Sequence, residues 1–250
     1  MEDTALKGYG YFTLGNYNGK PIQWVIIGYN SSTTLITDFF VQTLESWYGN
    51  GGSEIASYLY ENADPAGQAI YSNSFGQPIM QSIFAEATFA IENTQELNPG
   101  EFLVLASENI FSTQFNVSNT GNTYDWSNLK TKIDDLYLKD LNLTEEEQQL
   151  IQPKDISTYS LDTTARTIND AYLFPLATTS RSTSQSFCVE NYLPDKTLRS
   201  ISAKWWLRSG QLTYTLYAYS VDANGVVITG NQAQTTSTQG VRPAMVVKLT

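Results

Sequence analysis

Apolar and polar positions at the start of the chain follow the pattern of antiparallel strands. Residues 9–14 and 22–29 each predict a strand, because aromatic and β-branched side chains dominate both segments. Asn18 and Gly19 lie between them, and both tolerate the positive φ angles of a two-residue hairpin turn. Residues 34–38 predict a third short strand, so the pattern indicates a β-meander.

From about residue 53, the spacing of the apolar residues changes to that of an amphipathic helix. Ser53 can cap a short first helix. Pro78 stands in the first turn of a second helix, where its missing N–H costs nothing. The predicted core faces of the two helices are Ile55, Tyr58 and Leu59, and then Ile79, Met80, Ile83, Phe84 and Ala87.

Two further helices are predicted in the middle of the chain. Asp125 is the expected N-cap of the first, and the apolar stripe of this helix is Trp126, Leu129, Ile133, Leu136 and Tyr137. Thr144 and Glu147 have the spacing of a capping box before a second, short helix, which Pro153 ends. We interpret the acidic residues 145–147 as a solvated first turn and not as a metal site.

Strand patterns return toward the C-terminal end. Residues 173–176 predict a short inner or edge strand, and a tight turn is expected at 222–225. The predicted closing strands are residues 205–208, 216–221, 225–229 and 241–249. Strands at both ends, with helices and long loops between them, predict a single α+β domain over residues 1–250 in which the N- and C-terminal strands pair.

Composition narrows the classes of function. The 250 residues have a formal net charge of -11, and no cluster of Lys and Arg stands out. Phosphate contacts need such clusters, so we expect no nucleic-acid partner. No apolar run approaches the roughly 18 residues of a membrane span, and the first residues lack the pattern of a signal peptide. We therefore expect neither membrane insertion nor an export signal in this sequence.

Two residue types that carry much enzyme chemistry are scarce. The chain has no histidine and one cysteine, Cys188. Their scarcity excludes His-based triads, an internal disulfide and a thiolate metal cluster, and it removes nearly all catalytic zinc sites. Cys188 lies between Phe187 and Val189, which favours a core residue over a nucleophile. We predict no catalytic residue, no metal site and no cofactor, and a protein that is not an enzyme.

The segment from Ser209 to Thr238 differs in composition from the rest of the chain. It contains no Lys, Arg, Glu, Met or Trp, and Asp222 is its one acidic residue. Tyr gives a large contact area with little loss of rotamer entropy, and Ser, Asn and Gly give adaptable hydrogen bonds. This composition is typical of a contact surface. The alternative interpretation is that Thr and Tyr are ordinary strand formers here.

The residues that flank this segment have structural roles in our interpretation. Trp205 and Trp206 are adjacent in a predicted strand, so their side chains point to opposite faces. We expect one of them in the core and the other packed under a loop. Arg208 and Arg242 are expected to pair with carboxylates and so to fix loops.

These flanks resemble an uncharacterised family of bacterial and phage domains. The resemblance rests on Trp205-Trp206-Leu207-Arg208-Ser209, on Val221 followed by Gly225, and on Gly240-Val241-Arg242-Pro243-Ala244. Residues 15–26 look like the opening hairpin of that family, and residues 126–137 look like its middle helix. The arrangement is similar in turn to the C-type lectin fold, in the branch shared with formylglycine-generating enzymes. That branch includes the variable proteins of diversity-generating retroelements.

The resemblance implies a surface whose residues are diversified. In such systems a reverse transcriptase randomises the adenines of a template, and the variable protein displays the result on the ligand face of the lectin fold. Randomised Asn codons never give Lys, Glu, Gln, Met or Trp, so Gln211, Gln232 and Gln234 are expected to be fixed. The candidate ligand-binding residues, within a variable segment of about 209–239, are Leu212, Thr213, Tyr214, Thr215, Leu216, Tyr217, Tyr219, Thr229, Asn231, Thr235 and Thr236.

Two functional features of the lectin-like relatives are not matched in this sequence. Formylglycine-generating relatives use paired cysteines, and Cys188 has no second cysteine to pair with. Leu193-Pro194-Asp195 looks like part of a lectin calcium motif, but the other ligands of a six- to eight-oxygen site are not evident.

We therefore predict a ligand-binding protein that works by recognition alone. The expected partner is a protein or cell-surface ligand, and the resemblance implies a virion-associated or cell-surface setting. A non-diversified glycan-binding module is the alternative. A hydrolase built on two of the 25 acidic residues is less favoured, because no spacing singles out a pair.

Overall fold

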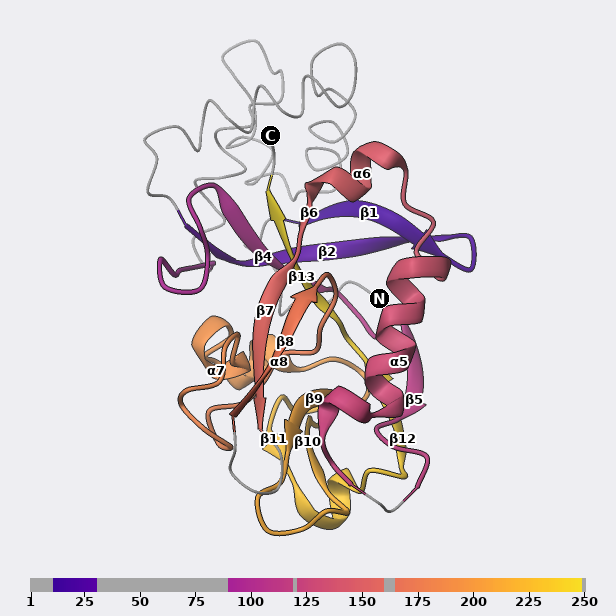
Figure 1. The fold of residues 1–250 in the computed structure, drawn as a ribbon, viewed down its shortest axis with the longest axis vertical. Helices are drawn as coiled ribbons and strands as arrows, with labels where there is room; N and C mark the ends of the chain where they lie inside the picture. Colours follow the sequence, from indigo (N-terminus) through magenta and orange to yellow (C-terminus); the bar gives the residue numbers. More distant parts are fainter. Residues whose placement is uncertain (1–10, 31–89, 119–120, 160–164, 249–250) are drawn as a thin grey trace.

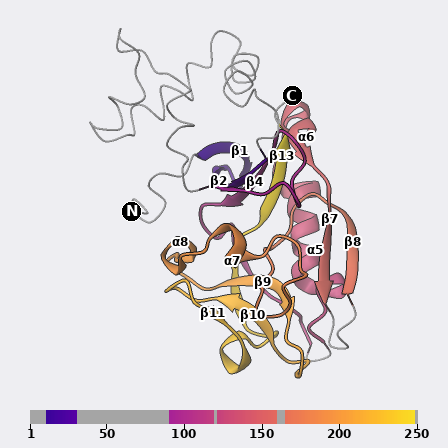
Figure 2. The ribbon, with the colours of Figure 1, turned by 90° about the vertical axis from the view of Figure 1, so that its left-hand side faces the viewer.

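Two β-sheets form the frame of the protein, and Figure 1 shows one above the other. The computed structural model describes residues 11–30, 90–118, 121–159 and 165–248. A separate hairpin, β7 (Lys154–Tyr159) with β8 (Ala165–Ala171), and the helix α5 (Asn128–Asp135) lie on the same side of the sheets (Figure 2). The described part of the chain is thus of the α+β class, with more strand than helix, and its buried apolar side chains form one cluster that both sheets share.

The first sheet has the order β1-β2-β4-β13-β6, and β3 pairs in parallel with β2. Its strands are β1 (Tyr11–Tyr17), β2 (Lys20–Tyr29), β3 (Ile91–Glu92), β4 (Glu101–Ala106), β6 (Ile151–Gln152) and β13 (Ala244–Lys248). The predicted hairpin is confirmed, with φ of 52° at Asn18 and 76° at Gly19. The predicted pairing of the N- and C-terminal strands is wrong, because β4 lies between β2 and β13. All six residues of β4 are buried, which suits the centre of a sheet.

The second sheet has the order β11-β10-β9-β12-β5. Its strands are β5 (Phe111–Gln114), β9 (Trp205–Gly210), β10 (Ala218–Val221), β11 (Val227–Ile228) and β12 (Thr238–Val241). β10 and β11 are shorter than the sequence predicts, and the predicted tight turn joins them, closed by the Gly225 N–H on the Asp222 carbonyl at 3.0 Å. β9 is buried at every position and pairs antiparallel with β10 and parallel with β12.

Trp205 and Trp206 are both fully buried. The Trp205 indole donates to the Arg199 carbonyl and lies under the Arg242 guanidinium, 5.3 Å from its ring centroid. The Trp206 indole donates to the Thr113 carbonyl and meets Phe115 edge to face. Their structural role is therefore confirmed, although both belong to the core, where the sequence predicts only one.

The helix α5 begins two residues later than the sequence predicts. Its cap is Ser127, whose hydroxyl accepts from the Lys130 N–H at 3.0 Å, and not Asp125. Trp126 belongs to the preceding turn η2 (Tyr124–Trp126) and is 72% exposed, so its assignment to the apolar stripe is wrong. Leu129, Ile133 and Leu136 are buried as predicted. After α5 the chain continues in a π-helical turn, η3 (Leu136–Asp140), which carries the half-buried Tyr137.

The capping box of α6 (Glu145–Leu150) is confirmed. Thr144 accepts from the Glu147 N–H, and the Glu147 carboxylate accepts from the Thr144 N–H at 2.8 Å. The other Glu147 oxygen accepts from the Gly15 N–H at 3.0 Å, so this one side chain also fixes α6 against β1.

The remaining segments are short. Phe174 forms an isolated bridge with Ala244, and residues 173–176 are all buried. The short helices are α7 (Val189–Tyr192), α8 (Lys196–Arg199) and η4 (Gly230–Ala233). The strand predicted at 34–38 and the helices predicted after Ser53 and Pro78 lie outside the described residues. Within the described ranges, no helix has the length and hydropathy needed to cross a bilayer.

Candidate functional site

The loop between β9 and β10 holds most of the predicted ligand-binding residues. β9 ends at the buried Gly210, residues 211–217 cross the end of the sheet, and β10 returns antiparallel to β9. In Figure 1 this end of the second sheet is the lower end of the molecule, away from α6. The loop therefore lies where side chains can project beyond the sheet.

The side chain of Asn122 fixes the path of this loop. Asn122 is 1% exposed, and its Nδ2 donates to the main-chain carbonyls of Gln211, Tyr214 and Tyr217 at 2.8, 2.9 and 2.8 Å. An amide nitrogen has two hydrogens, so one of them is shared between two acceptors. The Gln211 N–H also donates to the Tyr217 carbonyl at 3.0 Å, which closes the loop on itself. These contacts use only the main chain of the loop.

Seven of the predicted residues come together on this loop and the start of β10. Thr213 is exposed, Leu212 is 43% exposed and Tyr214 is 59% exposed, whereas Thr215, Leu216, Tyr217 and Tyr219 are half-buried. The Tyr214 and Tyr217 rings meet edge to face, with centroids 5.9 Å apart. We call these seven residues the 212–219 surface, and they are Leu212, Thr213, Tyr214, Thr215, Leu216, Tyr217 and Tyr219.

The second predicted segment, residues 229–236, supports the loop from beneath. The Thr235 N–H donates to the Leu216 carbonyl at 2.8 Å, and the Thr235 carbonyl accepts from the Asn116 N–H at 2.9 Å. Thr235 is fully buried, so its prediction as a surface contact is wrong. Thr229 and Thr236 are half-buried, and Asn231 lies in η4, with its side chain outside the described part of the structure.

Sequence reasoning missed two arginine–aromatic pairs, one of which contacts the end of β9 where the loop begins. Arg181 donates from Nε to the Gly210 carbonyl at 3.1 Å and lies over the Tyr159 ring at 5.0 Å. The neighbouring Ser180 carbonyl accepts from the Tyr219 hydroxyl at 3.4 Å. Arg166 lies 4.6 Å from the ring centroid of the exposed Trp126.

The sequence signal for these pairs is weak. Trp126 fits the spacing of a helical stripe, and the two arginines are brought to their aromatic partners by long-range folding. Guanidinium groups stacked on exposed aromatic rings are common in binding surfaces, because both groups keep a face available to a partner.

Arg208 does not have the role that the sequence predicts. Arg208 is fully buried and donates to the carbonyls of Ser157, Pro175 and Ser186, instead of pairing with a carboxylate. Burial lowers the pKa of its guanidinium to about 10, which still leaves it charged at neutral pH. Arg242 donates to the Ala106 carbonyl at 2.7 Å, so it too fixes main chain.

The residues considered for chemistry are structural. Cys188 is fully buried, its thiol donates to the Gln185 carbonyl at 3.2 Å, and burial raises the pKa of this thiol to about 12. In the Leu193-Pro194-Asp195 segment, the first two carbonyls accept from Arg199 and the Asp195 carboxylate caps α8. Among the residues that the structure describes, no group of three or more Cys, Asp and Glu side chains could hold a metal ion.

Comparison with known families gives one match. The model of a domain of unknown function, DUF6273, matches residues 100–249. The matched segment contains both sheet-forming motifs, 205–209 and 240–244, and all of the 212–219 surface, but not the opening hairpin. No curated protein and no solved structure matches the chain.

Proposed function

The chain belongs to the DUF6273 family, whose function is unknown, and we propose from its structure that it is a recognition protein whose 212–219 surface binds a protein on a cell surface. The observation that carries this proposal is the contact of Asn122 with three main-chain carbonyls of the loop. This contact fixes the main chain of the loop without using the loop's side chains. Apolar and aromatic side chains are therefore exposed to water on a backbone that is held by other residues. A rigid loop that exposes Leu212 and Tyr214 loses little entropy when a partner covers it.

The chemistry of the surface favours a partner with apolar and hydrogen-bonding groups. Its seven side chains carry no formal charge, in a protein whose formal net charge is -11. Tyr and Leu provide the apolar area, and the Thr and Tyr hydroxyls provide donors and acceptors. Arg181 adds a cation beside Tyr219. The surface is smaller than the roughly 20 residues a side of a standard interface, so tight attachment would come from several copies acting together.

We further propose that the scaffold is of the C-type lectin type and that a diversity-generating retroelement varies the 212–219 surface. The main-chain anchoring of the loop supports this, because side chains can change while the path is kept. Genome sequence tests it: a reverse transcriptase gene should lie nearby, with a near-copy of the segment encoding residues 209–242 that differs only at adenines. Without such a copy, the diversification part of the proposal fails and the binding part remains.

Site-specific photo-crosslinking tests the binding proposal. A photoreactive amino acid replaces Tyr214 in one protein and Leu138 in a matched control, because Leu138 is 72% exposed in the π-helical turn near α6. Each protein is incubated with intact cells of the source organism or its host. We expect crosslinks to a surface protein from position 214 and not from position 138. Excess wild-type protein should compete, whereas the Leu212→Ser, Tyr214→Ser double variant should not.

The outcomes separate the alternatives. Equal crosslinking from both positions, or equal competition by the double variant, would remove the 212–219 surface as the binding site. Crosslinking that a calcium chelator abolishes would point instead to the glycan-binding alternative.

A further inference from the structure

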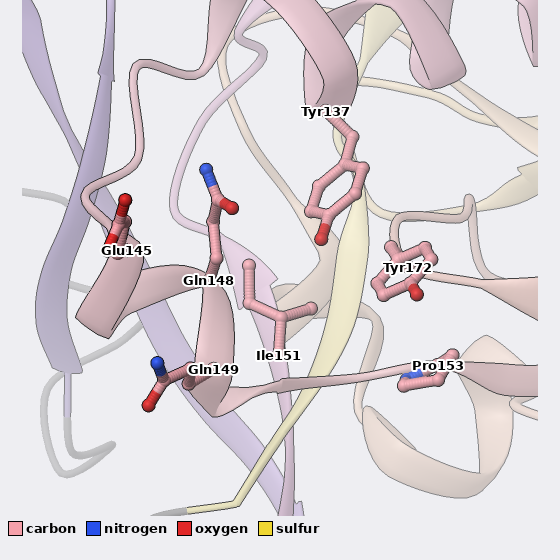
Figure 3. A pocket seen from close by; sticks show the side chains of 7 residues that line it. All are labelled: Tyr137, Glu145, Gln148, Gln149, Ile151, Pro153 and Tyr172. Carbon is pink, nitrogen blue, oxygen red and sulfur yellow. The ribbon is translucent and has the colours of Figure 1, made fainter.

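A groove lies beside α6, away from the 212–219 surface. It has a volume of about 530 Å³, and its walls come from the π-helical turn η3, from α6 and from the segment after β8 (Figure 3). Tyr137 and Tyr172 form one side, and Gln148 and Gln149 of α6 belong to the other. Its volume lies within the roughly 300–1,000 Å³ of small-ligand sites, but the groove is open to solvent, so a ligand would lie along it and not be enclosed.

Two irregularities of the main chain place the tyrosines. Tyr137 projects from the π-helical turn, which the Leu141 N–H closes on the Leu136 carbonyl at 2.8 Å. Tyr172 lies two residues after Asp170. Asp170 has a φ of 53°, which is uncommon for a residue other than glycine. The two rings stack with centroids 4.5 Å apart and an interplanar angle of 9°. π-helical turns are rare and frequent at functional sites, so this placement favours a binding wall over simple packing.

The opposite wall is held firmly although its side chains are exposed. Glu147 binds the N–H groups of both Thr144 and Gly15, which anchors the first turn of α6 to β1. Glu145, Gln148 and Gln149 are exposed on this anchored helix and line the groove. Their carboxylate and amide groups therefore have a fixed base from which to reach a ligand.

The lining has the chemistry of a site for a polyhydroxylated, uncharged ligand. It contains no Lys or Arg, so it offers nothing to balance a phosphate or a carboxylate. The amides of Gln148 and Gln149 can both donate to and accept from neighbouring hydroxyls, and the carboxylate of Glu145 can accept from them. Burial raises the pKa of the Tyr137 phenol, which keeps its hydroxyl as a donor.

The apolar surface of the groove suits the C–H groups of a sugar, just as its polar groups suit the hydroxyls. The tyrosine rings and the exposed Pro153 can pack against the C–H faces of a pyranose. We propose that this groove binds a neutral oligosaccharide of hexose units. The site does not depend on the 212–219 surface, because the two share no residue and the groove lies beside α6, away from the lower end of the second sheet (Figure 1).

Nuclear magnetic resonance of the side-chain amides gives a direct test. The ¹⁵N-labelled protein is titrated with maltotetraose, cellotetraose and β-1,4-mannotetraose, each to about 10 mM, a range that detects millimolar affinity. We expect at least one sugar to shift the Gln148 and Gln149 side-chain amide signals saturably. Tyr172→Ala should weaken that affinity about tenfold or more, whereas Tyr172→Phe should keep most of it, because the ring supplies the packing.

Variants on both surfaces make the result decisive. Gln148→Ala, which changes an exposed residue, should weaken binding even if Tyr172→Ala fails to fold, and Tyr214→Ser should leave it unchanged. The proposal is overturned if none of the three sugars moves the two amide signals, or if Gln148→Ala binds as tightly as the wild type does. Shifts caused by a proline-rich peptide and by no sugar would reassign the groove to peptide binding and would also overturn it.

Discussion

Gly210 and Asn122 pack so closely that a Cβ atom at Gly210 would lie 2.3 Å from the main-chain oxygen of Asn122. Only glycine at the end of β9 leaves room for Asn122 to sit beneath the loop that follows. The 212–219 surface therefore depends on a residue that is distant in sequence, and this dependence can be tested by substitution.

Asn122→Ala should loosen the loop of residues 211–217. It removes the donor for three carbonyls, and with about 1 kcal/mol per hydrogen bond we expect a loss of roughly 2–3 kcal/mol in the free energy of unfolding. Urea denaturation measures this loss, and hydrogen exchange should show faster exchange of the Gln211 and Tyr217 amides.

Asn122→Asp should destabilise the protein more than Asn122→Ala does. The carboxylate has almost the same shape as the amide, but it would face three carbonyl oxygens without a hydrogen to donate. Asn191→Asp on the exposed side of α7 is the matched control and should change stability by about 0.5 kcal/mol or less. Unchanged exchange of the loop amides in Asn122→Ala would show that Asn122 does not hold the loop.

Substitutions on the 212–219 surface should cost little stability. Leu212→Ser and Tyr214→Ser change exposed side chains, so each should alter the free energy of unfolding by about 0.5 kcal/mol or less. Thr235→Lys is the contrasting variant, because it places a charge at a fully buried position beneath Leu216. Thermal unfolding should separate the two groups clearly, and unfolding of the Ser variants would mean that Leu212 and Tyr214 belong to the core.

Arg208→Lys should be strongly destabilising although the charge is kept. A lysine ammonium cannot reproduce the planar guanidinium that reaches the carbonyls of Ser157, Pro175 and Ser186. We expect a loss of about 3 kcal/mol or more in urea denaturation, because carbonyls and a charge are left poorly paired in the interior. Arg166→Lys, on the hairpin beside exposed Trp126, should cost about 1 kcal/mol or less. Equal losses in the two variants would contradict this account of Arg208.

Cys188 should make the protein less stable as the pH rises from about 9 to about 12. The folded state raises the pKa of this thiol from 9.0 to about 12, so within that window the unfolded state loses its proton first. Fewer protons on the unfolded state mean that stability falls with pH, by at most about 1.4 kcal/mol per pH unit from this one group. The slope of unfolding free energy against pH should be shallower in Cys188→Ala than in the wild type. Identical slopes would show that the thiol is not protected in the folded state.

Local signals in the sequence predict local structure well. The turn at Asn18 and Gly19 and the capping box of Thr144 and Glu147 both depend on residues no more than three positions apart, and both are confirmed. The sequence places the cap of α5 two residues too early, because Asp125 and Ser127 are both good caps and only packing decides between them.

Long-range contacts explain what the sequence could not predict. Asn122 meets the loop across about ninety residues of chain, and nothing in its neighbourhood marks it. Thr235 has the composition of a surface residue, yet its main chain pairs with both Leu216 and Asn116 and is buried by them. Arg208 finds carbonyl partners on three separate segments, which no spacing rule describes.

The central position of β4 in the first sheet has a consequence for synthesis of the chain. Val25 pairs with Leu105, and Leu103 pairs with Val246, so this sheet joins segments from the two extremes of the sequence. During synthesis, the apolar strand β4 would have one edge unpaired until β13 is made, more than a hundred residues later. Such delayed closure favours slow folding and leaves an unpaired apolar edge open to aggregation until β13 has been made.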